Sequence, residues 1–299
     1  MPYTLLIGEY AYSDHSFRGW LELDAFDIPF KPNYVPLFSE EFTEKMSAHA
    51  PAKSLPILLD ETSRTGVLSW EPAATLEILV GRHPHAGHWP DDQEMSAHAR
   101  ALTARARTDF QALQNLPMNL HARYARYVPT KSEEEDADAF PELLGWALDT
   151  SGGPYLFGSA FSAADAAVAP IATRLVTYGF TIHNTAKSYI ETLYAHPSFR
   201  RWHACADAQL RKIECWHKDL PSGSNKAWPR HSVLPAQPHS GEISDAINAF
   251  CPYSGLPVDI DSLAEINGVV IGFCNPFCCR RGMADAQSWP TVMAILDKA

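Results

Sequence analysis

The stretch YAYSDHSFRGWLELDAFDIPF, residues 10–30, decides the fold of the N-terminal region. It follows YTLLIGE, residues 3–9, an apolar run that is typical of a buried strand. The polar segment SDHS then opens a helical pattern whose apolar residues, between Phe17 and Leu23, fall on one face. A buried strand that leads directly into an amphipathic helix predicts the beginning of a βαβ unit.

The rest of the first 80 residues continues this pattern. Three further strands are predicted at 30–35, 54–60 and 67–69. Residues 70–79 form a helical pattern with Pro72 in the first turn, where a missing N–H costs least. The βαβ half makes two strands parallel, and the last two strands are joined too closely for a crossover. We therefore expect a four-stranded mixed sheet with helices on both faces.

From Asp92 to about Cys215 the periodicity is almost wholly helical, which predicts an all-α second domain. We expect the acidic run Glu133 to Asp138 to be a solvated loop between two helices. Ser162 and Asp165 have the spacing of a capping box, which predicts a buried helix over 166–178.

The last part of the chain has a different composition. Residues 220–240 are rich in Pro, Ser and His, as linkers are. Beyond them, Asn267-Gly268 stands between two apolar runs and predicts a hairpin. We therefore expect three domains, at 1–80, 92–218 and 241–299.

The composition narrows the possible functions. With 46% apolar residues, the 299-residue chain is globular and long enough for more than one domain. The net charge of -11 argues against nucleic acid and anionic membranes as partners, because both need clustered Lys and Arg. The N-terminus lacks the features of a signal peptide, so we expect a cytoplasmic protein. The six cysteines, clustered toward the end of the chain, favour metal or redox chemistry in a reducing compartment.

Four segments, in the right order and spacing, resemble glutathione S-transferases. Residues 10–30 resemble the serine-type first helix of zeta-like members, and SLPILLD (54–60) resembles the segment that carries a cis-proline. SWEPAATLEIL (69–79) resembles the family's W-E-S-x-A-I-x-E-Y-L, and LFGSAFSAADAAVAPIATRLVTYGF (156–180) resembles its capping-box motif. The resemblance covers residues 1 to about 215. It implies the fold class α/β plus all-α, with a thioredoxin-like glutathione-binding domain and a helical bundle, and it implies a homodimer.

The spacing Ser13-x-x-Ser16 stands where a thioredoxin-type redox protein has Cys-x-x-Cys. A hydroxyl at this helix start can donate a hydrogen bond to the thiolate of a bound thiol, but it cannot exchange disulfides. The resemblance makes Ser13 the best match for the residue that activates the glutathione thiol, with His15 and Ser16 as alternatives. Ser13 can also be an N-cap only.

The resemblance implies further glutathione contacts. Leu55, next to a cis Pro56, matches the backbone pair that binds the cysteinyl part, although Pro56 can also shape only the loop. Glu71 matches the acid that holds the γ-glutamyl amine. Pro72 departs from the family, because the usual serine offers a hydroxyl and an N–H to the γ-glutamyl carboxylate. Each lost hydrogen bond to a carboxylate costs about 1.5–3 kcal/mol, so glutathione affinity is expected to be weak.

The C-terminal cysteines resemble those of a small YHS or TRASH-type metal-binding module, with Cys251-Pro252 at its opening and Cys274-x3-Cys278 at its close. Three cysteines brought together by a hairpin and a helix start select a soft ion such as Zn(II) or Cu(I). A small unit buries little apolar surface, so it needs a metal, a staple or docking to a neighbour. The alternative is a metal-free module docked on the helical domain, with reduced thiols. Cys279 is expected to point elsewhere.

Other polar and cysteine patterns have simpler interpretations. His83, His85 and His88 have a spacing that can chelate a metal but lie in a loop between domains. Pro117 is expected to end a long helix, with the alternative that residues 117–119 face the substrate cleft. Cys205 and Cys215 are expected to be ordinary thiols.

Two functions follow. The first is a glutathione transferase-like enzyme, of which isomerases and dehalogenases are a subset, in which Ser13 activates glutathione for attack on a small electrophile. The alternative is a non-catalytic transferase fold that has lost tight glutathione binding and handles metal through Cys251, Cys274 and Cys278.

Overall fold

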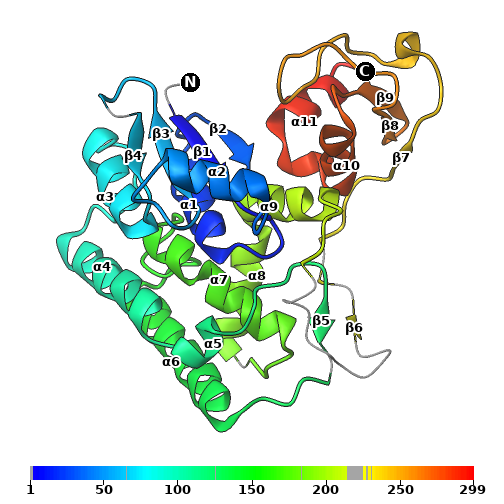
Figure 1. The fold of residues 1–299 in the computed structure, drawn as a ribbon. Coiled ribbons are helices and arrows are strands. Elements are labelled where there is room, and N and C mark those ends of the chain that lie inside the picture. The colour runs from blue at the N-terminus through cyan, green and yellow to red at the C-terminus, as the bar shows by residue number, and fades with distance from the viewer. Residues whose placement is uncertain are drawn as a thin grey trace. The chain divides into compact units, whose positions relative to one another are not determined.

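The structure, a computed structural model, describes residues 3–64, 66–124, 126–182, 184–213, 225–226, 228–229 and 231–299. Their contacts divide the chain into two compact units (Figure 1). Unit 1 comprises Met1–Tyr194 and Lys212–Trp228, and unit 2 comprises Ala195–Arg211 and Pro229–Ala299. The domain boundaries expected from the sequence, 1–80, 92–218 and 241–299, stay predictions.

Unit 1 begins with a four-stranded mixed sheet of order β2-β1-β3-β4. Its strands are β1 (Tyr3–Ile7), β2 (Phe30–Tyr34), β3 (Ile57–Asp60) and β4 (Val67–Ser69). β1 pairs with β2 in parallel and with β3 antiparallel, and β3 pairs antiparallel with β4. The mixed sheet expected from the sequence is confirmed, and the Leu55–Pro56 peptide is cis as predicted.

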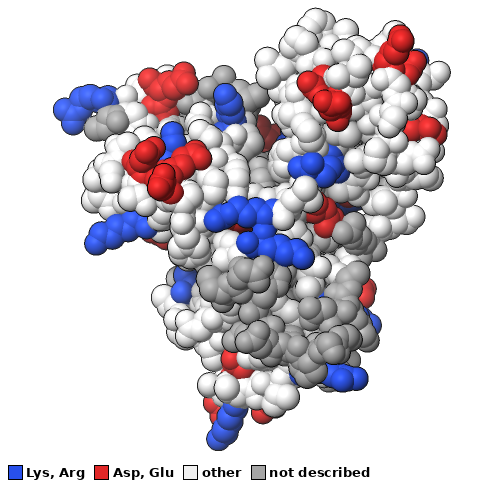
Figure 2. Space-filling model, turned by 45° about the vertical axis from the view of Figure 1, so that its right-hand side comes forward, with Lys and Arg blue, Asp and Glu red and all other residues white. Residues whose placement is uncertain are grey.

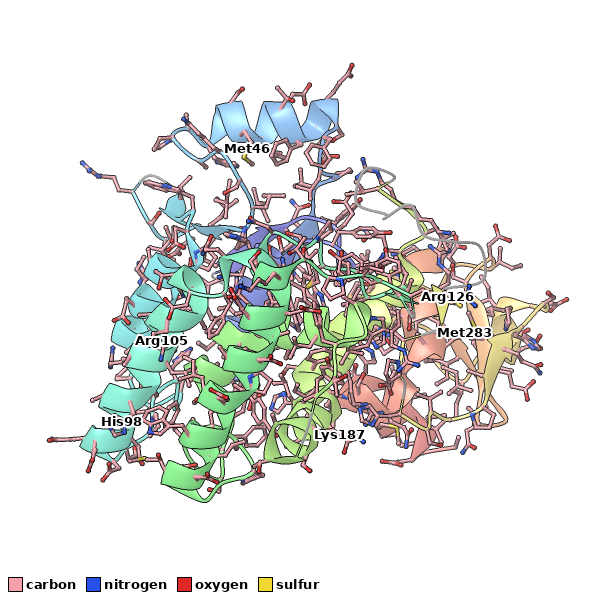
Figure 3. All side chains as sticks on the ribbon, turned by 90° about the horizontal axis from the view of Figure 1, so that it is seen from below. Met46, His98, Arg105, Arg126, Lys187 and Met283 are labelled. Atoms are coloured by element: carbon pink, nitrogen blue, oxygen red, sulfur yellow. The ribbon has the colours of Figure 1, made fainter. Side chains whose placement is uncertain are left out.

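Helices cover both faces of this sheet, because successive residues of β1 point in opposite directions. On the face of Leu5 lies α1 (Asp14–Asp24), which also contacts α3 (Pro72–Arg82). On the face of Leu6 lies α2 (Glu40–Ala48), whose Phe42 and Met46 pack against the buried cluster around Leu6 (Figure 3).

Helix α2 was not predicted from the sequence. The helix has no fully buried residue, so its apolar periodicity is weak. Its signal was the cap: the Ser39 hydroxyl accepts from the Phe42 N–H at 3.1 Å, and Glu40 and Glu41 occupy the first turn. Serine at the N-cap and acids in the first turn are typical of a helix start.

The second part of unit 1 is helical, as predicted. Its helices are α4 (Gln93–Thr108), α5 (Gln111–Gln114), α6 (Lys131–Ser151), α7 (Ala163–Thr177) and α8 (Asn184–Ala195). β5 (Arg123–Tyr124) pairs with β6 (Asn225–Lys226). The predicted capping box before α7 is confirmed, since Asp165 accepts from both the N–H and the hydroxyl of Ser162 at 2.8 Å. α7 is buried along almost its whole length and contacts both α1 and α4.

The prediction of a solvated loop over Glu133 to Asp138 is wrong, because these residues form the first turns of α6. Thr130 and Glu133 make a capping box, in which the Glu133 carboxylate accepts from the Thr130 N–H at 2.7 Å. Asp136 accepts from the N–H groups of Ala112 and Leu113 at 2.9 and 3.2 Å. Acids here stabilise the positive N-terminal ends of two helices rather than solvating a loop.

Unit 2 combines α9 (Pro197–Ala208) with the C-terminal residues. Its sheet has the order β7-β8-β9, with β7 (Ala236–Pro238), β8 (Leu263–Ile266) and β9 (Val269–Gly272), all antiparallel. The helical elements that follow are α10 (Pro276–Ala284), η3 (Ala286–Ser288) and α11 (Pro290–Leu296), and η2 (Ile243–Asp245) precedes the sheet's second strand. The predicted hairpin is confirmed: Asn267 and Gly268 have φ angles of 51° and 82°, as a two-residue turn requires.

The C-terminal residues dock on α9. The Arg200 guanidinium makes two hydrogen bonds of 2.7 Å with the Asp285 carboxylate, and the Arg280 Nε donates to the Ala208 carbonyl at 2.8 Å. The predicted linker over 220–240 is wrong in part, because β7 pairs with β8. Trp228 is also buried, and its indole N–H donates to the Asn119 carbonyl at 3.0 Å.

The surface shown in Figure 2 carries small groups of acidic and basic side chains separated by uncharged areas. Among the described helices, none is both long and apolar enough to cross a membrane.

Candidate functional site

The start of α1 places Ser13 at a helix N-terminus. Ser13 has an extended backbone with φ of -90°, and its Oγ accepts from the Ser16 N–H at 3.4 Å. The Ser13 hydroxyl donates to the Ser16 Oγ at 2.7 Å, and the Gly8 N–H donates to the same Ser16 oxygen at 3.0 Å. Both readings of Ser13 are therefore compatible with its place: it is an N-cap, and its hydroxyl lies where a helix N-terminus favours an anion.

A cavity of about 510 Å³ opens in front of Ser13. Its walls come from the start of α1, the segment before and within α2, the segment before β3, the segment after α5, and α7. The lining residues are Tyr12, Ser13, Asp14, His15, Leu37, Phe38, Phe42, Lys53, Ser54, Leu55, Gln114, Asn115, Leu116, Pro117, Met118 and Arg174. The cavity has the size of a small-molecule site and mixes apolar walls with a few charged groups.

An ion pair crosses this cavity's wall. The Arg174 Nη2 donates to the Asp14 Oδ2 at 2.9 Å, and the Arg18 Nη1 lies 3.7 Å from the same oxygen. Burial opposes ionisation of Asp14, but Arg174 and Arg18 outweigh it and hold the pKa of this carboxyl well below its ordinary value. Burial also lowers the pKa of Arg18, to about 10. The wall beside Ser13 therefore carries a fixed negative charge with two arginines around it.

The remaining charged residues of the cavity lie nearer to solvent. His15 is half exposed, and its Nε2 lies 3.9 Å from the Asp14 Oδ1. Partial burial lowers the pKa of His15, and Asp14 opposes that shift. The exposed Lys53 lines the cavity from the segment before β3.

The structure brings together three of the six residues that the resemblance connects with glutathione: Ser13, His15 and Leu55 line the cavity. Ser16 lies behind Ser13, buried and hydrogen-bonded to it. Pro56 follows Leu55 and packs against Gly19 of α1.

Glu71 is the N-cap of α3, and its Oε2 accepts from the Ala74 N–H at 2.9 Å. Its Oε1 lies 3.6 Å from the Arg107 Nη1. Pro72 is the first residue of α3 and is buried. An amine held by Glu71 would therefore share that carboxylate with the helix start and with Arg107.

Several residues that line the cavity were not predicted from the sequence. Phe38 and Phe42 belong to the unpredicted α2 region. Arg174 gave no signal, because only the fold shows that α7 crosses the start of α1. The prediction that Pro117 ends a long helix is wrong: α4 ends at Thr108, α5 follows, and Pro117 and Met118 line the cavity. Pro117 and Met118 instead agree with the alternative, in which residues 117–119 face a cleft.

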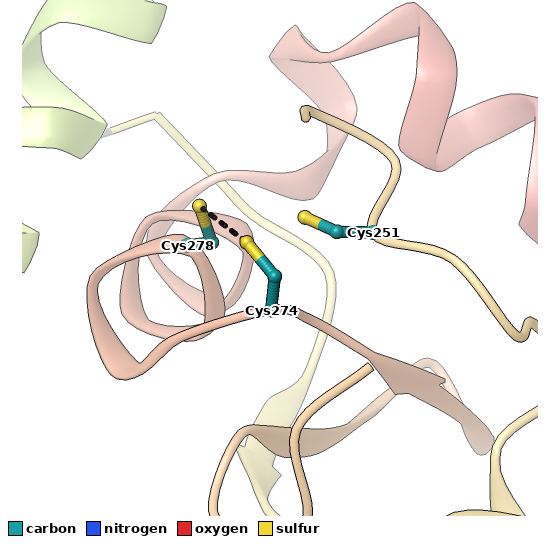
Figure 4. A group of neighbouring side chains, drawn as sticks. All are labelled: Cys251, Cys274 and Cys278. Carbon is teal, nitrogen blue, oxygen red and sulfur yellow. Dashed lines mark hydrogen bonds between the residues drawn. The ribbon is translucent and has the colours of Figure 1, made fainter. Parts of the chain in front are cut away.

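A second polar cluster lies in unit 2. The sulfur atoms of Cys251, Cys274 and Cys278 all lie within 4.8 Å of one another, and those of Cys274 and Cys278 are 4.0 Å apart (Figure 4). A Zn–S bond is about 2.3 Å long, so two sulfurs on one ion lie about 3.8 Å apart. The three predicted cysteines therefore stand close to the spacing that one soft ion needs.

Hydrogen-bond donors surround these sulfurs. The Cys274 sulfur lies 3.1 Å from the Ser254 Oγ and 3.2 Å from the Asn275 Nδ2. The Arg281 Nη2 donates to the Cys278 sulfur at 3.5 Å, and its guanidinium lies over the Tyr253 ring at 3.8 Å. A hydrogen bond from the Cys278 thiol lowers the pKa of Cys251, whereas the same hydrogen bond and burial raise the pKa of Cys278. Of this pair, Cys251 is therefore favoured as the thiolate, the form that binds a metal, and a metal ion would have to displace the proton of Cys278.

The other cysteines and histidines stand apart from this cluster. Cys279 lines a different cavity, of about 450 Å³, and burial raises the pKa of its thiol to about 11. Cys205 is buried in α9, and Cys215 lies outside the described residues. His83 bonds to the Tyr3 hydroxyl and His88 to the Glu22 carbonyl. Within the described ranges, the three-cysteine cluster is the one group of three or more His, Cys, Asp or Glu residues with metal-site spacing.

The comparison with protein families agrees with this fold. Residues 133–205 match the family model described as glutathione S-transferase, C-terminal domain. A search of curated protein sequences finds no match.

Solved structures of similar fold cover about two thirds of the chain. A glutathione transferase homologue from Burkholderia gl BGR1 with bound glutathione is 23% identical, with a TM-score of 0.52 over 68% of this chain and 96% of that chain. A maleylacetoacetate isomerase from Anaeromyxobacter dehalogenans is 20% identical, with a TM-score of 0.53 over 72% and 97%. A diazinon-metabolizing glutathione S-transferase of the silkworm Bombyx mori is 16% identical, with a TM-score of 0.55 over 68% and 96%. The chain therefore has the fold of the glutathione S-transferases.

Proposed function

We propose that this protein is a glutathione transferase-like enzyme that activates the glutathione thiol for attack on a small electrophile. The cavity in front of Ser13 carries the proposal, because a hydroxyl, a helix N-terminus and the Asp14–Arg174 ion pair border an opening of about 510 Å³. The glutathione bound to the homologue from Burkholderia gl BGR1 supports the choice of ligand.

In this proposal Ser13 stabilises the thiolate. Lowering a thiol pKa by about two units takes about 2.7 kcal/mol. One hydrogen bond to a charged group contributes about 1.5–3 kcal/mol, and a helix N-terminus about 0.3–1 kcal/mol. The Ser13 hydroxyl donates to Ser16 in the structure, so it must turn toward the cavity when the thiolate is present. The Gly8 N–H still donates to Ser16 after that turn.

The other proposed glutathione contacts come from the segment before β3 and from the start of α3. Leu55 offers its backbone to the cysteinyl part, and Glu71 offers its carboxylate to the γ-glutamyl amine. His15 lines the cavity beside Ser13, Ser16 supports Ser13 from behind through their hydrogen bond, and Pro56 fixes the direction of the backbone at Leu55. Pro72 offers neither of the two donors that a serine supplies there, so we propose weak binding.

Titration calorimetry with glutathione tests this function directly. We expect binding to one site per chain, and a thermal shift that grows with ligand concentration. At 100 times the dissociation constant a ligand adds about 2.7 kcal/mol to stability. Saturating, millimolar glutathione without heat or thermal shift would leave the non-catalytic alternative.

We further propose that Cys251, Cys274 and Cys278 form the metal site of a YHS-like module and bind one zinc or copper ion. The sulfur spacing and the donors around it fit a soft ion, and thiolate ligands favour Zn(II) or Cu(I) over Mg(II). Elemental analysis of protein purified without chelator should give close to one equivalent. Less than about a tenth of an equivalent, in protein also exposed to zinc and to Cu(I), contradicts the proposal.

The assembly and location of the protein are also proposals. We propose a cytoplasmic homodimer, as the resemblance implies, acting on a small electrophile without nucleic acid or membrane partners. Light scattering of the purified chain distinguishes one copy from two.

A further inference from the structure

The wall beside Ser13 contains a negative charge that works against the proposed chemistry. Asp14 is the first residue of α1 and follows Ser13 directly, and both residues line the cavity. A carboxylate at the N-terminus of α1 uses the same favourable field that a bound thiolate would use. An uncompensated Asp14 would also repel that thiolate, because like charges in one site oppose each other's ionisation.

Arg174 compensates this charge from α7. Its Nη2 donates to the Asp14 Oδ2 at 2.9 Å, and the Arg174 side chain is only 4% exposed. The guanidinium is held on all sides: its Nε donates to the Leu116 carbonyl at 2.6 Å, its Nη1 to the Pro170 carbonyl at 3.1 Å, and its Nη2 also to the Gln114 carbonyl at 3.3 Å. A fork with so many fixed donors has one orientation.

The same side chain fixes a second wall. Gln114 and Leu116, whose carbonyls Arg174 binds, also line the cavity. Arg174 therefore connects three parts of the cavity: the start of α1, the end of α5 with the segment after it, and α7. Arg18 helps less, because its Nη1 lies 3.7 Å from Asp14 and its Nε donates to the Ala167 carbonyl.

We propose that Arg174 is a positioning residue of the thiol site: it neutralises Asp14 from within the wall, so that Asp14 does not oppose the negative charge of a bound thiolate. This inference rests on the proposed glutathione function. It goes beyond that function, since it assigns the thiolate's stability partly to a side chain whose hydrogen bonds go to Asp14 and to backbone carbonyls and not to Ser13.

Few of the charged groups around Asp14 titrate in the pH range in which the pKa of the bound thiol would be measured. Around Asp14 stand His15 and Arg18 from α1 and Arg174 from α7, and Lys53 faces the cavity from before β3. Deeper in the unit, Arg107 pairs with Glu22 and Glu71. Asp14 stays ionised above pH 5, because its pKa is depressed, and Arg18 stays charged below its value of about 10. Of the groups named here, those that can change protonation between pH 5 and 9 are thus the bound thiol, His15 and Glu22. The pKa of His15 is lowered, and the pKa of Glu22, which is paired with Arg107, is raised to about 8.

The test is a spectrophotometric titration of the thiolate of glutathione bound to the full chain. Arg174→Gln removes the charge and should raise the pKa of the bound thiol by about one to two units, from Coulomb's law at an effective dielectric constant of about 20. Arg174→Lys keeps the charge and should raise it less. The double variant Asp14→Asn with Arg174→Gln removes both charges and should return the pKa to within about half a unit of the parent.

Arg105→Gln is the matched control. Arg105, labelled in Figure 3, pairs with Asp109 at 2.8 Å on the exposed side of α4, away from the cavity lining. It should leave the thiol pKa unchanged.

Four outcomes separate the possibilities. A raised pKa in Arg174→Gln that the double variant restores supports the inference. A raised pKa that the double variant does not restore overturns it, because Arg174 then acts only through packing. Parent protein that binds glutathione while Arg174→Gln shows the parent pKa also overturns it and leaves the proposed function intact, whereas parent protein without glutathione binding overturns both.

Discussion

The cavity of unit 1 and the thiol cluster of unit 2 differ in what holds their residues in place. Ser13 and Arg174 belong to α1 and α7, whose apolar side chains are almost all buried. Cys251 and Cys274 belong to short connections beside strands of four residues, and Phe250 and Leu256 next to them are 61% and 58% exposed. Packing therefore holds the first site in place, whereas the second depends on what its own polar groups bind. Removing one polar group from the cavity should therefore change its chemistry and leave its structure in place. Removing one polar group from the cluster should change the structure of the cluster itself.

The largest effect is expected at the thiol cluster. Cys278→Ser should abolish binding of zinc or copper, because two thiolates remain and Cys278 is also the residue that Arg281 contacts. Loss of the ion should make residues 241–299 sensitive to protease while the N-terminal 194 residues stay intact. Elemental analysis and mass spectrometry of the fragments measure both.

Cys279→Ser is the control for this variant, since Cys279 is adjacent, buried and outside the cluster. Cys205→Ser should also keep the ion. A tail that resists protease in metal-free Cys278→Ser protein would show that docking on α9, through Arg200 and Asp285, is enough to hold it.

A smaller effect is expected at Ser13. Ser13→Ala should lower glutathione-dependent turnover by about ten- to a thousandfold and leave glutathione affinity nearly unchanged, because the hydroxyl acts on the thiolate. It also removes an N-cap, which costs about 1 kcal/mol of stability. Steady-state kinetics and calorimetry separate the two effects.

Thr130→Ala removes an N-cap with the same 3.4 Å hydrogen bond, at the start of α6. It should cost similar stability without a change in turnover. Equal losses of turnover in the two variants would mean that Ser13 acts only as a cap.

Pro72→Ser should strengthen the glutathione site of unit 1, whereas the variants above weaken the two sites. A serine at the first position of α3 restores a hydroxyl and an N–H, and each hydrogen bond to a carboxylate is worth about 1.5 kcal/mol or more. We expect about tenfold tighter glutathione binding by calorimetry. Pro290→Ser, at the equivalent position of α11, should leave it unchanged. Equal affinities of Pro72→Ser and the parent would show that position 72 does not weaken the site.

The difference between the two sites also explains what the sequence could predict. The strands of the four-stranded sheet, the capping box of α7 and the Asn267-Gly268 hairpin follow from local rules, and so they were predicted, whereas β5, β6 and β7 were not. The three cysteines were found because their residue type and spacing carry the chemistry by themselves.

Arg174 and Asp14 show the opposite case. They are 160 residues apart, and their contact depends on how α7 crosses α1, which no local pattern contains. The acidic start of α6 was misread because charge alone does not distinguish a solvated loop from a capped helix end. There the signal was Thr130, three residues before Glu133, the spacing of a capping box.

The last prediction concerns the pH dependence of stability and rests on Glu22, a buried carboxyl inside the packed unit 1. Its Oε1 accepts from the Arg107 Nη2 at 3.0 Å, whereas its buried Oε2 has no hydrogen-bond partner among the described residues. Burial raises the pKa of Glu22 to about 8, and Arg107 opposes that shift. The folded protein therefore holds a proton that the unfolded chain has released between about pH 4.3 and pH 8. Because the folded state binds more protons in this window, the free energy of unfolding should fall as pH rises, by at most about 1.4 kcal/mol per pH unit.

Glu22→Gln should remove this slope, while Glu77→Gln, at an exposed carboxyl paired with Arg100, should keep it. Urea unfolding at several pH values measures the difference, and parallel curves for the parent and Glu22→Gln would mean that Arg107 keeps Glu22 ionised throughout, so that its burial carries no pH-dependent cost.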